Sequence, residues 1–160
     1  MIRSLFILTI VLCALLLQSC FKVEPYSPIP SIEFMDFKIV DTSDLLGNRV
    51  LNGTLHFYFV DGDGDIGFDT TSPRQNTIFL DKYKVSNGIE SKIDVLVPLS
   101  YFVPEFSNSS NNRTLKGEMI INDLNENFPL EYDTILYKFY IVDRSGNTSN
   151  VESTGFIKLQ

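Results

Sequence analysis

Residues 55–69, LHFYFVDGDGDIGFD, combine a regular apolar alternation with a run of aspartates and glycines. Leu55, Phe57 and Phe59 occupy alternate positions, and the intervening side chains point the other way. A period of two places one face of a β-strand against a core. Three aspartates separated by glycines follow directly, and glycine and aspartate are typical of turns. The sequence therefore predicts a buried strand that leads into an acidic loop.

The rest of the chain after residue 30 has the same character. Short apolar and β-branched runs alternate with Gly, Asn, Asp, Ser and Pro, and no stretch shows the 3.6-residue period of a helix. We expect one all-β domain, an immunoglobulin-like β-sandwich of about seven strands over residues 31–160. The clearest further alternation runs through Ile93, Val95, Val97 and Leu99, and through Ile135, Tyr137, Phe139 and Ile141. The predicted strands are Ser31–Val40, Val50–Val60, Thr77–Val85, Ser91–Leu99, Thr114–Asn122, Asp133–Val142 and Asn150–Leu159.

The N-terminal residues, MIRSLFILTIVLCALLLQSC, have the layout of a secretory signal, with one positive charge and then an apolar run. The run is shorter than the roughly 20 residues of a membrane-spanning helix. LQSC, which ends at Cys20, resembles the lipobox of bacterial lipoproteins. This resemblance implies that residues 1–19 are removed and that Cys20 is lipidated, which would anchor the protein to a membrane. Phe21 stands where an inner-membrane lipoprotein would have aspartate, so we expect the outer membrane, on either its surface or its periplasmic side.

Residues 20–30 contain three prolines and predict an extended spacer outside the domain. Of the two cysteines, Cys13 falls in the signal and Cys20 is the lipidation site, so no disulfide is expected. The net charge is −7, and loss of Arg3 with the signal makes it one unit more negative. An acidic surface argues against nucleic acid or an anionic bilayer as the partner of the domain.

Two segments resemble known bacterial sequences. FYIVDRSGNTSN, residues 139–150, is similar to the closing hairpin of bacterial immunoglobulin-like domains. FYFVDGDGDIG, residues 57–67, resembles a motif of uncharacterised bacterial outer-membrane lipoproteins with such domains. The resemblance implies a scaffold and no particular activity.

The acidic loop predicts a metal site. Asp61, Asp63 and Asp65 match positions 1, 3 and 5 of an EF-hand loop, but Ile66 and Ser72 stand where that loop needs Gly and Glu. The loop is therefore not an EF-hand. Its glycines still allow the chain to curl and to turn alternate carboxylates inward.

We expect these three aspartates to bind Ca²⁺, joined by Asp69 and by Asp143 from the neighbouring hairpin. In an immunoglobulin-like topology the loops 61–76, 100–113 and 143–149 lie at one end of the sandwich. An all-oxygen group favours calcium over zinc or copper, and magnesium remains an alternative. The simpler alternative is a solvated acidic turn with no ion.

The function expected from these features is a noncatalytic binding or assembly module of the cell envelope. Tyr101, Phe102 and Phe106 lie among polar residues in one loop and suit contact with an envelope protein or a glycan. The single histidine, His56, lies in a strand, and no nucleophile motif is visible, so we expect no enzyme. The alternatives are a lipid or small-ligand carrier, if the strands close as a barrel, and a glycan-active enzyme.

Overall fold

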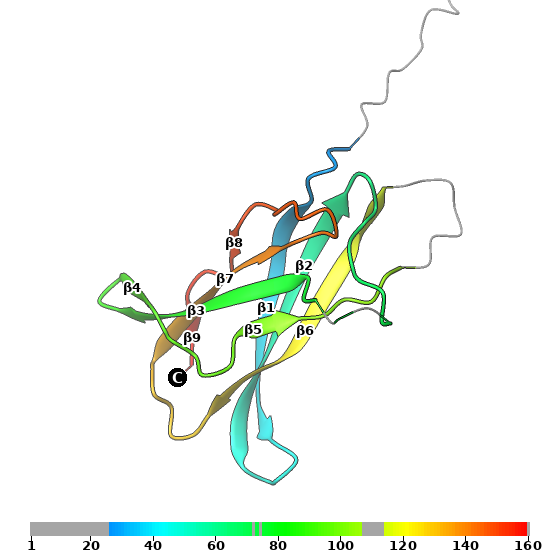
Figure 1. Ribbon diagram of the computed structural model, residues 1–160. Helices are drawn as coiled ribbons and strands as arrows, with labels where there is room; N and C mark the ends of the chain where they lie inside the picture. The colour runs from blue at the N-terminus through cyan, green and yellow to red at the C-terminus, as the bar shows by residue number, and fades with distance from the viewer. Residues whose placement is uncertain (1–25, 72, 74, 107–113, 160) are drawn as a thin grey trace, which may run out of the picture.

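The computed structural model describes residues 26–71, 73, 75–106 and 114–159, and within these ranges its regular structure is all β (Figure 1). Cys20 and the predicted signal, residues 1–19, lie outside the described residues. In the described part, no helix is long and apolar enough to cross a membrane.

The strands form two antiparallel sheets that pack face to face (Figure 1). The first has the order β1-β2-β6, and its strands are β1 Ser31–Ser43, β2 Arg49–Asp61 and β6 Leu115–Asn127. The second has the order β4-β3-β7-β8, with β5 paired to β3 and β9 paired to β7. Its strands are β3 Ile78–Ser86, β4 Ile89–Lys92, β5 Leu99–Tyr101, β7 Thr134–Ile141, β8 Glu152–Ser153 and β9 Ile157–Lys158.

The alternating side chains of β2 and β7 form the centre of the core, as the pattern predicts. Leu55, Phe57 and Phe59 are almost fully buried, and the rings of Phe57 and Phe139 lie 5.2 Å apart between the two sheets. The described strands make two separate sheets around a common core. The described strands do not close into the single barrel on which the carrier alternative was based.

Two predicted strands are broken in the structure. The segment 91–99 is strand only at its two ends, and Leu96 is fully exposed. The Ile93 N–H still donates to the Lys82 carbonyl at 2.8 Å, after which the chain leaves β3 until Leu99. Pro98 has no N–H to donate to a ladder. The segment 150–159 is likewise split into β8 and β9.

Part of the predicted spacer belongs to the domain. Pro30 is fully buried at the start of β1, and the Ser27 carbonyl accepts a hydrogen bond of 2.9 Å from the Gly62 N–H. Residues 26–30 therefore contact the sandwich, whereas the proline content alone suggested a segment outside it. They lie at the end of the molecule opposite the β1–β2 turn (Figure 1).

An ion pair between β3 and β6 joins the facing sides of the two sheets. Lys82 of β3 forms an ion pair of 2.6 Å with Glu126 of β6, and both side chains are about 14% exposed or less. The buried hydroxyl of Tyr137 on β7 donates to the same carboxylate at 3.1 Å. Burial and this neighbouring charge raise the pKa of Tyr137.

The Asn150 side chain forms hydrogen bonds with the backbone of Ile32 on the outer edge of β1. The Asn150 side-chain oxygen accepts from the Ile32 N–H at 2.8 Å, and the Asn150 amide donates to the Ile32 carbonyl at 2.9 Å. This pair of bonds ties the chain before β8 to the first sheet.

Candidate metal centre

Four aspartates meet at the end of the sandwich where residues 26–30 enter. Asp61 is the last residue of β2, Asp63 and Asp65 lie in the β2–β3 loop, and Asp143 lies in the turn that follows β7. Each offers one carboxylate oxygen, and these four oxygens all lie within 4.8 Å of one another. Two oxygens on opposite sides of a calcium ion are about 4.6–5.2 Å apart. The spacing therefore fits a shared ion.

The burial of these oxygens points to a missing ligand. Asp61 is completely buried, and its Oδ1 has no hydrogen-bond partner among the described residues. The Oδ1 atoms of Asp63 and Asp65 are also buried and without a partner. Buried polar atoms are rarely left unpaired, because an unpaired buried group costs roughly 1–3 kcal/mol. A bound cation would satisfy all three at once.

The second oxygen of Asp61 shapes the loop. Asp61 Oδ2 accepts hydrogen bonds from the N–H groups of Asp65, at 2.8 Å, and Ile66, at 3.2 Å. Gly64 has φ of +71°, which glycine adopts without steric strain, and this lets the loop turn back on itself. Ile66 is fully buried in the core, as expected from the sequence, and fixes the end of the loop.

Asp65 links this loop to the turn after β7. Its Oδ2 accepts from the N–H and the hydroxyl of Ser145, at 3.1 and 2.7 Å. Its carbonyl accepts from the Arg144 N–H at 3.2 Å. The oxygen that these bonds do not use, Oδ1, is buried and has no hydrogen-bond partner among the described residues.

Asp143 is held by its own turn. Its two carboxylate oxygens accept from the N–H of Asn147, at 2.7 Å, and from the Asn147 side-chain amide, at 2.8 Å. Gly146 provides the positive φ of +85° in this turn, and Asn147 holds Asp143 through both its backbone N–H and its side-chain amide. Asp143 is 1% exposed.

The four carboxylates have no cation beside them among the described residues. Arg144 follows Asp143, but its guanidinium pairs with Glu105 at 2.8 Å and with the Gly67 carbonyl at 3.2 Å. Burial raises the pKa of Asp61 to about 6; the Asp65 N–H opposes this shift, and the charges of Asp63 and Asp65 reinforce it. At an effective dielectric constant of about 20, two unit charges at this spacing repel by about 3.5 kcal/mol. The group is electrostatically unfavourable without an ion.

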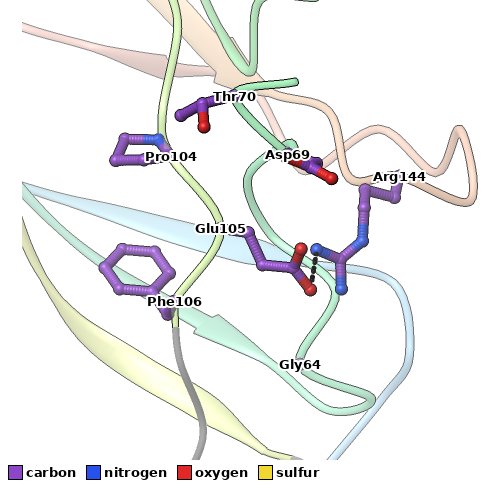
Figure 2. Close-up of a pocket in the computed structure, with 7 residues that line it drawn as sticks. All are labelled: Gly64, Asp69, Thr70, Pro104, Glu105, Phe106 and Arg144. Atoms are coloured by element: carbon purple, nitrogen blue, oxygen red, sulfur yellow. Dashed lines mark ion pairs between the residues drawn. The ribbon is translucent and has the colours of Figure 1, made fainter. Parts of the chain in front are cut away.

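Asp69 does not join this group. It is exposed, and its Oδ1 accepts from the Thr71 N–H at 2.8 Å, which lowers the pKa of Asp69. Figure 2 shows it instead in a neighbouring polar pocket of about 550 Å³, above the ion pair of Glu105 and Arg144. The pocket is lined by Gly64, Asp69, Thr70, Pro104, Glu105, Phe106 and Arg144.

The three aromatic residues predicted to bind a partner do not share one surface. Tyr101 pairs with Ile78 and packs against the core, and with Phe102 it lines a groove of about 260 Å³ beside β6. Phe106 is 42% exposed, lines the polar pocket, and stacks on Phe59 with ring centroids 6.3 Å apart. His56 lies away from the four aspartates, on β2, where its ring nitrogen bonds Glu118 of β6 at 3.0 Å.

Sequence reasoning did not identify the residues that orient the aspartates. Ser145 and Asn147 lie within the DRSGN turn, from which the sequence predicts only Asp143 as a site residue. Their serine and asparagine side chains are typical donors to carboxylates, and this was the available signal.

No protein-family model, curated protein or solved structure matches this chain.

Proposed function

We propose that the protein is a noncatalytic binding or assembly module of the bacterial envelope, an immunoglobulin-like β-sandwich whose loop end is stabilised by calcium. The observation that carries the calcium site is the set of buried, unpartnered Oδ1 atoms on Asp61, Asp63 and Asp65. The strand order, with β1-β2-β6 facing β4-β3-β7-β8, supports the immunoglobulin-like arrangement.

Calcium is favoured by the donor set and by its spacing. All four ligand atoms are carboxylate oxygens, with no sulfur or imidazole among them. Calcium accepts six to eight oxygens in flexible geometry, whereas magnesium requires opposite oxygens about 4.0–4.2 Å apart. The buried position of the unpartnered oxygens supports a stabilising role, since a structural ion is enclosed by protein.

The loop end supports a binding role. Segments 61–71, 101–106 and 143–149 meet there: the Phe68 N–H donates to the Val103 carbonyl, and Arg144 pairs with Glu105. A rigid scaffold that presents loops at one end is a common design for recognition. The partner is an envelope protein or a glycan.

The experiment is calorimetric titration and thermal unfolding of the full-length protein in detergent, in calcium and in chelator. Binding to the folded state alone raises the free energy of unfolding by about 2.7 kcal/mol at a hundredfold excess over the Kd. A variant with Asp63→Asn and Asp65→Asn loses most of this gain. The absence of both binding heat and a melting shift at millimolar calcium would show a solvated acidic turn.

The lipid anchor rests on the LQSC block and is tested separately. Mass spectrometry of protein extracted from outer membranes should find residues 1–19 absent and Cys20 acylated. A Cys20→Ser variant should lose membrane attachment. An intact Met1 or an unmodified Cys20 would contradict the proposal.

A further inference from the structure

The acidic loop also touches the segment through which the chain enters the domain. Gly62 lies between two of the four aspartates, and its N–H donates to the Ser27 carbonyl at 2.9 Å. A Cβ atom at Gly62 would lie 2.3 Å from the carbonyl oxygens of both Ser27 and Tyr26. Residues 26–30, here called the strap, therefore pack against the loop at a distance that only glycine permits.

Further contacts hold both sides of this junction. The Thr114 hydroxyl donates to the Gly62 carbonyl at 3.3 Å, and the Lys116 ammonium lies 5.8 Å from the centroid of the Tyr26 ring. The Ile29 N–H donates to the Ser27 hydroxyl at 3.0 Å, which orders the strap itself. Only Pro30 of the strap is buried, so few apolar contacts hold the segment. The docking of the strap on the domain therefore depends on the position of Gly62.

That position depends in turn on the flanking carboxylates. Without an ion, Asp61 and Asp63 repel each other and their Oδ1 atoms have no partner. With an ion, both are drawn to one centre, and the backbone between them is fixed. The equilibrium constant for an opening that releases the ion therefore falls in proportion to the calcium excess over the Kd.

We propose that calcium at the four aspartates locks the strap onto the domain, so that the ion controls how the N-terminal segment leaves the sandwich. This inference rests on the proposed calcium site. In a protein anchored through its N-terminus, strap docking would set the orientation of the domain relative to the membrane. The coupling is reciprocal, so a docked strap raises calcium affinity by the same factor.

The test is amide hydrogen exchange by NMR on the full-length protein in detergent, labelled with ¹⁵N-glycine and ¹⁵N-isoleucine. The chain has nine glycines, so the Gly62 signal is readily assigned. In calcium at a hundredfold excess over the Kd, exchange at Gly62 and at Ile29 should slow together, by up to about 100-fold relative to chelator. Ile29 reports the order of the strap at Ser27, because its N–H donates to the hydroxyl of the residue whose carbonyl accepts from Gly62.

A glycine variant tests the reciprocal effect. Gly62→Ala should displace the strap, leave Ile29 in fast exchange in calcium, and weaken calcium binding by the factor that separates the two wild-type exchange rates. Gly117→Ala on β6 is the matched control, because its Cβ would meet only the Phe59 ring, at 3.6 Å, and it should behave as wild type.

The outcomes separate the two proposals. Slowing at Gly62 without slowing at Ile29 would overturn the strap inference and leave the calcium site intact. Unchanged strap exchange in Gly62→Ala would also overturn it. An absence of calorimetric calcium binding would overturn the calcium site itself. If Gly62→Ala does not fold, the wild-type comparison of Gly62 and Ile29 still decides.

Discussion

Asp65 and Ser145 are 80 positions apart in the chain, yet the Asp65 carboxylate accepts two hydrogen bonds from Ser145, one from its N–H and one from its hydroxyl. The bonds occupy one carboxylate oxygen and leave the other buried and without a hydrogen-bond partner among the described residues. The loop after β2 and the turn after β7 thus form one ligand group before any ion arrives.

Removal of the Ser145 hydroxyl should weaken calcium binding without unfolding the protein. Ser145→Ala retains the N–H bond but loses the 2.7 Å bond that orients Asp65. Partners that orient metal ligands typically contribute tenfold or more in affinity, so we expect a loss of about tenfold by calorimetry. Ser91→Ala, at an exposed position on β4, is the control. Equal affinity in both variants would contradict this role.

Asp61→Asn should raise the stability of the calcium-free protein and lower the stability of the calcium-bound protein. Asparagine retains an oxygen for the N–H groups of Asp65 and Ile66 but removes a buried charge. In calcium-free buffer at pH 7, the variant should be more stable than wild type by up to about 3 kcal/mol, which corresponds to the raised pKa of Asp61, about 6. In calcium it should be the less stable protein. Urea unfolding in both buffers measures this reversal, and a variant that is less stable in both would contradict the electrostatic account.

The same carboxyl should give the calcium-free protein a pH-dependent stability. The pKa of Asp61 is about 6 in the folded chain, above its usual value of 3.8. Below pH 3.8 the group is protonated in both states and has no effect; above about pH 6 it is ionised in both, and the full penalty applies. The contribution of Asp61 should therefore lower stability as pH rises from about 4 to 6. Melting curves of wild type and Asp61→Asn across this range, in calcium-free buffer, should diverge; parallel curves would contradict it.

Lys82→Met should strongly destabilise the sandwich. The change leaves the Glu126 carboxylate buried between the sheets without its cation, and loss of one partner of a buried pair costs about 3–5 kcal/mol. The double variant with Glu126→Gln should recover part of this loss. Lys92→Met, which removes an exposed pair with Asp81, should cost less than about 1 kcal/mol and serves as the control. Chemical unfolding gives all three values, and equal losses for Lys82→Met and Lys92→Met would refute the expectation.

Strand identity was predictable where one face of a strand is buried. The alternation in β2 and β7 marks residues that are nearly all buried, because period two places them on the core side of a sheet. The same alternation at Val95 and Val97 was misleading, since both are exposed. Alternation states which residues share a face, but not whether a neighbouring strand is present to pair with them.

The candidate site was predictable within the loop and only partly across loops. Alternate carboxylates with glycines between them placed Asp61, Asp63 and Asp65 together, and the expected meeting of loops added Asp143. Asp69 fits the same acidic composition but lies four residues beyond Asp65, after the chain has turned at Gly67, where φ is +88°. The bond between Ser27 and Gly62 depends on the path of a proline-rich segment, which composition does not define.

The Asn150 side chain makes the two hydrogen bonds that a further strand would make with Ile32. Its amide satisfies both the N–H and the carbonyl of Ile32 on the outer edge of β1. An unpaired edge is a template on which a foreign chain can extend a sheet, and natural β proteins block such edges. At Ile32 the blocking group comes from the same chain. Asn150 therefore occupies the hydrogen-bonding position that a foreign strand would need at Ile32, near the start of the first sheet.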